Sequence, residues 1–422
     1  MSFGNELRTR RLAEGLSLGE LAKILHYSKG HLSRIETGSK RASEDLARQC
    51  DRTLCAEGRL LLAWTESVET SPRPRGRMPP PVQLPSISRY FTGRRDAIAT
   101  LNEVLVEPAD RPGATRVVLV NGTVGVGKTT LALEWAYRNI SAFPDGILFR
   151  DLHAYGHDNN SVDVGDVLTG FLSALGIDND AIPEDVHERA TLFRSTLARC
   201  RMLIILDNVR SAEQVRLLFP NSPLCVVLVT SRHRLPGLAA REGARRVALG
   251  PLSPEESCEV LRAITTAAGR SIPTEESAAL LELAQRCDYL PLALRIAGER
   301  YSSGRYTCLA DLIADLSRAT SPLDFLELAE DSSMSIRSAF SWSYNTLARE
   351  DARAFRLVGP RSGAGISVQA AAELLGVPPP RACRHLDTLY QAGLLELVTP
   401  GVYRTGTLLG AYATELARRQ TE

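Results

Sequence analysis

The chain has 422 residues and a formal net charge of +1, and 44% of its residues are hydrophobic. These values are typical of a globular protein of about three domains, and a net charge so close to zero means that any DNA-binding surface is a local patch. No apolar run approaches the roughly 18 residues of a membrane span, and the first residues lack the apolar core of a secretory signal, so we expect a cytoplasmic protein with no membrane partner. The eight cysteines form no CxxC pair, so we expect reduced thiols.

Residues 1–65 have the pattern of an all-α domain built from short helices. Ser17 and Glu20 form a capping-box pattern at the start of one amphipathic helix. A second helix is expected after Ser28, with Leu32 and Ile35 pointing inward.

Residues 66–88 are rich in Pro, Ser and Arg, a composition that cannot bury a core, so they are expected to form an extended linker. Its arginines at 73, 75 and 77 either touch DNA backbone or, as we favour, are solvated.

Residues 89–250 alternate short apolar runs with helical stretches. Continuous apolar strands between helices predict a parallel sheet covered on both faces, a P-loop α/β domain. The runs are RVVLVN, GILFRD, RMLIILDN, CVVLVTS and RRVALG.

The stretch from Gly122 to Thr129 matches the phosphate-loop pattern GxxxxGK[ST] in full and directly follows the first apolar run. Glycines let successive backbone N–H groups point at phosphate oxygens, and the following helix presents its N-terminus to the anion. Lys128 is expected to reach the β and γ phosphates, and Thr129 to hold Mg²⁺. We therefore expect ATP or ADP with Mg²⁺ as cofactors. The predicted loop contacts are Gly122, Thr123, Val124, Gly125, Val126, Gly127, Lys128, Thr129 and Thr130.

Two further strand ends carry candidate catalytic residues beside Lys128. Asp207 ends the run LIILD and is expected to be the second Mg²⁺ ligand. Asn208 follows it where a second acid would serve as general base, so we expect a slow ATPase at most. Arg232 follows VVLVTS and is either a γ-phosphate sensor or a surface arginine; the pattern alone does not decide.

Residues 251–325 are predicted to be mostly helical, with a Ser253 cap and Glu256 three residues later. Residues 326–422 mix helices with a hairpin signal around Pro400 and Gly401 in LLELVTPGVYRTG. Helices followed by a small hairpin predict a winged-helix domain at the C-terminal end.

These motifs together resemble the NB-ARC branch of the STAND ATPases, and within it the actinobacterial AfsR-type regulators, from about residue 82 to 422. QLPSISRYFTGR is similar to the segment that packs near adenine in that family and places Phe91 there, and FRDLHAYG resembles the motif after it. CDYLPLALRIAG resembles the GLPL motif, in which Pro291 lies against the base. The resemblance implies that Arg232 is the sensor arginine and that the P-loop, helical and winged-helix parts close over ADP.

The chain departs from this family at the Met-His-Asp motif, whose His touches the ADP β phosphate. Gly406 and Thr407 stand in its place, so the ADP latch is expected to be weaker or to use another residue, with Arg404 as the nearest cation. The family usually continues into sensor repeats where this sequence ends, so we expect the sensor to be absent, truncated or supplied by a separate protein.

The first 65 residues resemble the Xre/Cro/C1 helix-turn-helix family through SLGELAKIL and SKGHLSRIETGSKR. In that fold the second helix of the pair enters the major groove of double-stranded DNA. Arg34 is expected to contact a guanine, and residues after the helix suit phosphates. The predicted DNA contacts are Lys29, His31, Ser33, Arg34, Lys40 and Arg41.

We therefore expect a transcriptional regulator whose DNA binding is switched by ADP or ATP, with homo-oligomers formed on activation. One alternative is a STAND immunity or stress protein whose N-terminal helices recruit a protein. Another is an ATPase motor that acts on DNA. A basic outer face on the helix at 28–36 favours DNA, and Asn208 argues against a fast motor.

Overall fold

The computed structural model describes residues 3–25, 27–37, 42, 44–54, 56, 58–69, 79–107, 114–152, 162–328 and 334–419. The chain forms two compact units, Met1–Pro79 and Pro80–Glu422, which are described separately. No helix in the described ranges is both long and apolar enough to span a bilayer.

In its described residues the first unit contains helices and no strands, as predicted. Ser17 and Glu20 form the predicted capping box at α2, and Ser28 caps α3 by accepting from the His31 amide. A bidentate ion pair from Arg11 of α1 to Glu36 of α3 joins two helices at 2.6 and 2.9 Å. The helices are α1 (Phe3–Ala13), α2 (Leu18–Ile24), α3 (Lys29–Glu36), α4 (Glu44–Thr53) and α5 (Arg59–Glu69).

Both ends of the segment predicted as a linker are structured. Helix α5 continues to Glu69, past the expected start at residue 66, because Leu60 and Ala63 give it a buried face. At the other end, residues 81–83 run beside β2: Ile147 N donates to Pro81 O at 2.6 Å, and Gln83 N donates to Ile147 O at 3.0 Å. The arginines at 73, 75 and 77 lie outside the described residues.

The second unit is built on a five-stranded parallel sheet, as the sequence predicted, with the order β2-β3-β4-β1-β5. Each strand coincides with one of the five predicted apolar runs. The strands are β1 (Arg116–Gly122), β2 (Ile147–Asp151), β3 (Leu203–Asp207), β4 (Val226–Ser231) and β5 (Arg245–Leu249). In β1 the side chains of Val118 and Val120 belong to one buried cluster and those of Val117 and Leu119 to another, so both faces are covered.

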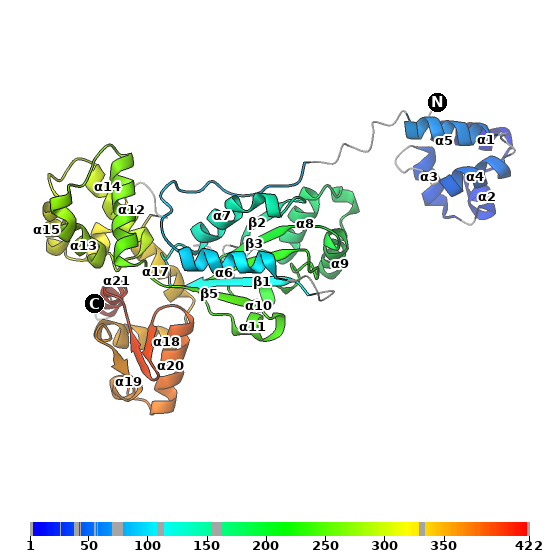
Figure 1. Ribbon diagram of the computed structural model, residues 1–422. Helices are drawn as coiled ribbons and strands as arrows, with labels where there is room; N and C mark the ends of the chain where they lie inside the picture. Colours follow the sequence, from blue (N-terminus) through cyan, green and yellow to red (C-terminus); the bar gives the residue numbers. More distant parts are fainter. Residues whose placement is uncertain are drawn as a thin grey trace. The chain divides into compact units, whose positions relative to one another are not determined.

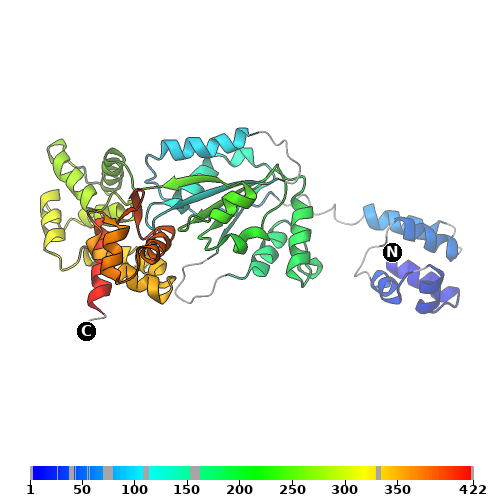
Figure 2. The same cartoon turned by 90° about the horizontal axis from the view of Figure 1, so that it is seen from below.

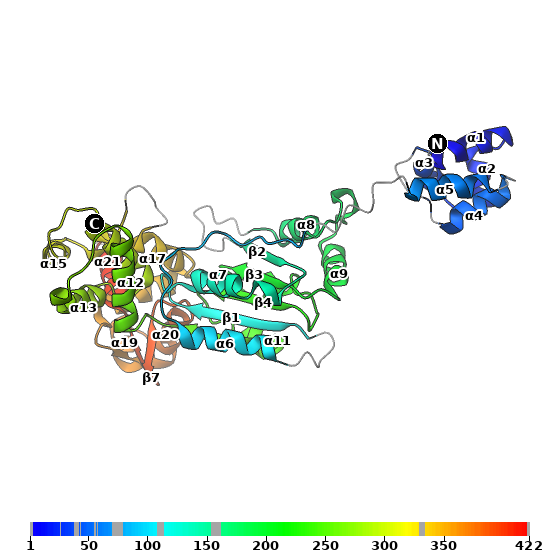
Figure 3. The same ribbon diagram turned by 45° about the horizontal axis from the view of Figure 1, so that its top comes forward.

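Helices cover the two faces unequally. Helices α6 (Arg95–Val106) and α7 (Lys128–Arg138) pack on one face of the sheet, and α8 to α11 pack on the other (Figures 1 and 3). The second group comprises α8 (Val164–Ala174), α9 (Val186–Leu197), α10 (Ala212–Arg216) and α11 (Pro236–Glu242). Short 3₁₀ turns lie at Ile140–Ala142 and Asn179–Ala181.

A helical segment follows the sheet, and its first helix carries the predicted capping box of Ser253 and Glu256. Figure 2 shows these helices beside the C-terminal region, at one end of the sheet. The segment contains α12 (Pro254–Ala267), a 3₁₀ turn (Thr274–Glu276), α13 (Ser277–Arg286), α14 (Pro291–Ser302), α15 (Leu309–Arg318) and α16 (Pro322–Phe325).

The C-terminal region combines helices with a three-stranded sheet of order β6-β8-β7. The hairpin predicted around Pro400 and Gly401 is confirmed as the antiparallel pair β7 and β8. Its elements are α17 (Ile336–Asn345), α18 (Arg349–Val358), a 3₁₀ turn (Gly359–Arg361), β6 (Ile366–Ser367), α19 (Val368–Leu375), α20 (Pro379–Gln391), β7 (Glu396–Thr399), β8 (Val402–Arg404) and α21 (Thr407–Arg418).

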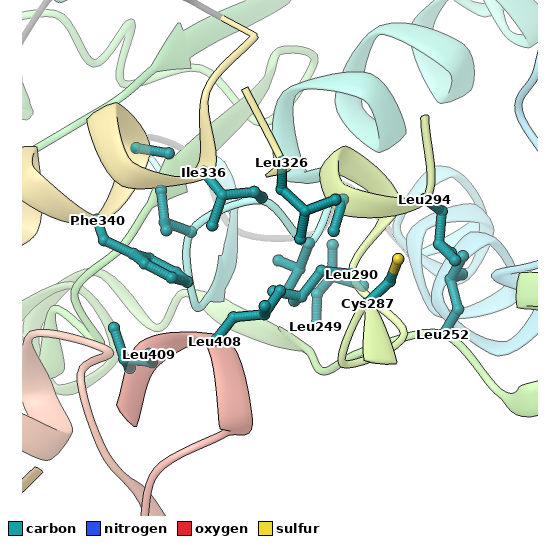
Figure 4. Packing of buried hydrophobic residues seen from close by; sticks show 14 of the residues in the cluster. Leu249, Leu252, Cys287, Leu290, Leu294, Leu326, Ile336, Phe340, Leu408 and Leu409 are labelled. Atoms are coloured by element: carbon teal, nitrogen blue, oxygen red, sulfur yellow. The ribbon is translucent and has the colours of Figure 1, made fainter. Parts of the chain in front are cut away.

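One apolar cluster joins the sheet, the helical segment and the C-terminal region of the second unit. Figure 4 shows its central section, where side chains from β5, the helical segment, α17 and α21 meet. The side chains of Leu249, Leu290, Phe340 and Leu408, which come from β5, the helical segment, α17 and α21, are all buried. The carboxyl end of the sheet is therefore in direct contact with the helical and C-terminal parts.

Candidate nucleotide site

The phosphate loop lies at the carboxyl end of β1, where α/β sheets place their ligands. Gly125 and Gly127 have φ angles of +79° and +88°, which favour glycine. Gly122 is confined for a different reason, because a Cβ there would lie 2.2 Å from Leu249 O on the adjacent strand. The loop ends where α7 begins at Lys128, so the N-terminus of that helix faces the loop.

The Lys128 ammonium is buried and folds back onto the loop. Its Nζ donates to Gly122 O at 3.0 Å and to Thr123 O at 2.9 Å. The pKa of Lys128 is lowered to about 7, first by burial and then by the positive charge of Arg232, against the opposite effect of Asp207. A cation held by neutral carbonyls beside another cation favours the arrival of an anion.

Two side chains suited to a magnesium ion, one from the start of α7 and one from the end of β3, lie together. Thr129 Oγ1 donates to both carboxylate oxygens of Asp207, at 2.8 and 2.9 Å, and Thr230 Oγ1 also donates to Asp207. Burial raises the pKa of Asp207 to about 6 against the effect of these hydrogen bonds. A hydroxyl and a carboxylate are hard oxygen ligands of the kind that Mg²⁺ prefers, so the pair fits this ion.

Asn208 uses its amide to join two carboxylates. Its Nδ2 donates to Asp151 Oδ1 at 3.0 Å and to Asp207 Oδ2 at 3.1 Å. Its backbone has a φ of +55°, which asparagine tolerates better than most residues. Asp151, at the end of β2, was not singled out from the sequence; the signal was its place after an apolar run, like that of Asp207.

Arg232 is buried, with 6% of its surface exposed, and its guanidinium contacts the C-terminal region. Its Nη1 donates to Ala339 O at 3.0 Å and to Ser343 Oγ at 3.2 Å, both on α17. The guanidinium also lies over the Trp342 ring, 5.2 Å from its centroid. The sequence left open a surface position for Arg232, and the structure excludes it.

A cavity of about 240 Å³ brings most of the predicted nucleotide contacts together. Gly122 and Thr123 do not line it and instead hold Lys128 through their carbonyls, and Asp207 lines an adjoining cavity with Thr129. The predicted residues that line the first cavity are Phe91, Val124, Gly125, Val126, Gly127, Lys128, Thr129, Thr130, Arg232 and Pro291.

Sequence reasoning missed several residues of this cavity. The Arg94 guanidinium donates to Val126 O at 2.9 Å. The backbone of Arg94 is left-handed (φ +60°), and its backbone N–H donates to the Glu256 carboxylate at 2.7 Å. Burial lowers the pKa of Arg94. The signal for it was its position as the last residue of the QLPSISRYFTGR segment, three residues after Phe91. The remaining missed residues are Ser88, Tyr90, Thr92, Asn208, Leu252, Val260, Leu292 and Arg295.

The helical segment docks on the phosphate loop through the start of α14. Leu292 N donates to Gly125 O at 3.2 Å. Pro291 Cγ lies 3.8 Å from where a Cβ on Gly127 would be. The loop conformation and the position of α14 therefore depend on each other.

Gly406 and Thr407 do not line the nucleotide cavity. They line a second cavity of about 300 Å³ that reaches Thr123 and Val124 on the loop. Asp288, between α13 and α14, accepts from Leu408 N at 2.7 Å and so caps α21 from another part of the unit. A Cβ on Gly406 would lie 2.8 Å from Asp288 Oδ2, so a larger residue here would have to displace this carboxylate.

Arg404, the cation expected to compensate for the missing histidine, is engaged elsewhere. It is exposed, forms an ion pair with Glu396 at 3.1 Å and does not line the nucleotide cavity.

The predicted DNA contacts on α3 present a partly basic face. Leu32 and Ile35 are buried as predicted, while Lys29 and Arg34 are exposed and His31 and Ser33 are half-buried. Arg34 Nε donates to Gly30 O one turn earlier, at 3.3 Å. Lys40 and Arg41 lie outside the described residues.

Comparison with known families matches two parts of the chain. Residues 2–64 match the family model of a helix-turn-helix domain, and residues 94–270 match that of the NB-ARC domain. The second match covers the phosphate loop, Asp207 and Arg232.

The chain is also similar to regulatory proteins named AfsR. It is 39% identical to the one from Streptomyces coelicolor over 342 residues, 80% of this chain and 33% of that protein. It is 36% identical to the one from Streptomyces griseus over 422 residues, 98% of this chain and 40% of that protein. The chain thus spans about a third to two fifths of the length of these relatives.

Among solved structures, a STAND protein with a tetratricopeptide repeat sensor from Pyrococcus horikoshii shares 19% identity, with coverage of 78% of this chain and 43% of that one. The TM-score of 0.34 is too low to compare domain positions. The family matches and the parallel sheet agree: this chain joins an N-terminal helix-turn-helix domain to an NB-ARC domain and continues into a helical C-terminal region.

Proposed function

We propose that this chain is a transcriptional regulator whose DNA binding is set by the adenine nucleotide in the phosphate-loop cavity. The contacts of Arg232 carry this proposal. The arginine lines the cavity, yet its guanidinium is bound to Ala339 O and Ser343 Oγ of α17. A single buried cation therefore touches both the ligand space and the C-terminal region, so an anion in the cavity competes with α17 for it.

The cavity favours ADP or ATP as the ligand. The loop amides and Lys128 supply the phosphate contacts, and Phe91 and Pro291 supply apolar surface for the base. Thr129 and Asp207 would hold Mg²⁺, which neutralises phosphate charge when it is bound with the nucleotide. Lys128, Asp207 and Arg232 are then the groups around the transferable phosphate.

Turnover is expected to be slow, because the residue after Asp207 is Asn208. Its amide is occupied in holding Asp151 and Asp207, and an amide cannot act as a general base. Hydrolysis then resets the switch.

The C-terminal region is proposed to be a winged helix. Helices α19 and α20 followed by the β7–β8 hairpin have the order of such a domain. In the ADP form it stays bound to the sheet domain through Arg232. In the ATP form Arg232 turns to the γ phosphate, and the freed region allows self-association and contact with a separate sensor protein. This coupling requires that each nucleotide binds the two forms with different affinity.

The N-terminal unit is proposed to be an Xre/Cro/C1-type domain that reads double-stranded DNA through α3, in a cytoplasmic protein. Exposed Lys29 and Arg34 suit base edges, and Lys40 and Arg41 suit phosphates.

The test is the DNA affinity of the full chain with ADP and with ATP. We expect the two affinities to differ in the wild type and to become equal in Arg232→Ala. Arg234→Ala is the matched control, because Arg234 lies over the Tyr390 ring at 4.5 Å but does not line the cavity. It should keep the nucleotide response. Wild-type DNA affinity that does not depend on the nucleotide would overturn the switch, and N-terminal binding to a protein instead of DNA would favour the signalling alternative.

A further inference from the structure

A basic hollow lies in the C-terminal region, away from the nucleotide cavity. It has a volume of about 870 Å³ and lies between α18, the end of α19 and α20. Four arginines and one glutamate line it, which leaves a formal charge of +3 with histidine counted as neutral. The charged and titratable lining residues are Arg349, Glu350, Arg353, Arg356, Arg381 and His385.

Some of these cations are engaged with neighbours. Arg381 donates to Glu350 at 2.8 Å, on the exposed rim. His385 Nδ1 lies 2.6 Å from Asp351 Oδ1. Arg356 donates to the Tyr344 hydroxyl.

Arg349 and Arg353 remain available. Both are exposed and lie one turn apart on α18. Within the residues that the structure describes, neither forms a hydrogen bond or an ion pair. Two guanidinium groups at this spacing can contact two neighbouring phosphates, because arginine presents several donors in one plane.

The pKa of Glu350 shows that the hollow favours negative charge. The pKa of Glu350 is lowered, first by the hydrogen bond from Arg381 and then by the charge of that arginine, with further contributions from His385 and Arg353. Cations from both α18 and α20 therefore act on one negative charge at this position. Another anion bound in this hollow would be attracted by the same cations.

We propose that this hollow is a second DNA contact, in which Arg349 and Arg353 bind the phosphate backbone of a duplex. The inference rests on the proposed function, since it assumes that the chain binds DNA. Charge-to-phosphate contacts add affinity without reading sequence. Because both units belong to one chain, the second contact is made at a raised effective concentration once the first has formed.

The test is the salt dependence of DNA binding by the full chain, with Arg349→Ala/Arg353→Ala as the variant. Each lost phosphate contact reduces the slope of log affinity against log salt by about 0.9. Two contacts reduce it by about 1.8, so a fourfold rise in salt should cost the variant about 12-fold less affinity than it costs the wild type. The reduction is expected on operator and on unrelated duplexes alike, with the ratio of the two affinities unchanged.

Arg199→Ala/Arg201→Ala is the matched control, since both arginines are exposed and lie in the same unit, just before β3. It removes the same charge and should keep the wild-type slope. A slope in the Arg349/Arg353 variant equal to that of this control overturns the inference, and a loss of polyglutamate binding with an unchanged DNA slope would assign the hollow to an acidic protein instead.

The failures of the two proposals are distinguishable. If the wild type binds no duplex at all, the proposed function fails and the inference fails with it. If Arg34→Ala impairs operator binding while Arg349→Ala/Arg353→Ala keeps the wild-type slope, only the inference fails.

Discussion

Asp288 holds the start of α21 on the helical segment, and its replacement should loosen the C-terminal region. The carboxylate accepts from Leu408 N at 2.7 Å, at the second residue of α21, where that helix has no partner of its own for the amide. Burial raises the pKa of Asp288, and the hydrogen bond from Leu408 opposes this rise. The Leu408 amide therefore stabilises the carboxylate at this buried position.

The expected magnitude follows from this geometry. Removal of a capping acceptor costs about 1 kcal/mol on average and up to about 2 kcal/mol. In Asp288→Ala the population in which the first turn of α21 is open should then rise by about 5- to 30-fold. Asp288→Asn keeps a side-chain oxygen of the same shape, and its effect should be much smaller.

Hydrogen exchange of the α21 amides in the nucleotide-free full chain measures this population. Faster exchange in Asp288→Ala, with near wild-type exchange in Asp288→Asn, is the expected result. Exchange of Leu408 and its neighbours that is the same in Asp288→Ala and the wild type would refute the reasoning and would mean that other contacts hold α21.

Three further predictions concern the nucleotide and the DNA. The pKa of Lys128 is lowered to about 7, and a bound phosphate should raise this pKa, so metal-free ADP binding should take up protons and ADP affinity should fall as the pH rises above 7. Calorimetry in two buffers of different ionisation enthalpy measures this proton uptake, which Lys128→Ala should abolish. Asp207→Ala should remove the Mg²⁺ dependence of ATP binding while metal-free ADP still binds, and wild-type ATP turnover should lie far below the ~10 s⁻¹ of a typical enzyme; a fast rate that depends on Asp207 would indicate a motor. Arg34→Ala should cost about 1–3 kcal/mol of operator affinity and relax one base position, and an equal loss on all sequences would contradict a base contact.

The local backbone of this protein was determined by short stretches of its sequence. The five strands followed from apolar runs, because only strands covered on both faces are apolar throughout. The caps at Ser17 and Ser253 and the hairpin at Gly401 followed from residues next to one another in the chain. The phosphate loop also followed from the sequence alone, since its glycines and Lys128 lie close together in the chain.

The partners of the functional side chains were decided by tertiary packing alone. Arg232 directly follows β4 as predicted, but its acceptors lie on α17, 107 and 111 residues further along the chain. Gly406 could be aligned with a histidine position, yet only the fold shows that Asp288, 120 residues before Leu408, occupies the space there. Hydrogen bonds over such separations leave no pattern in the sequence, because their geometry depends on how the apolar core brings the sheet, the helical segment and α21 together.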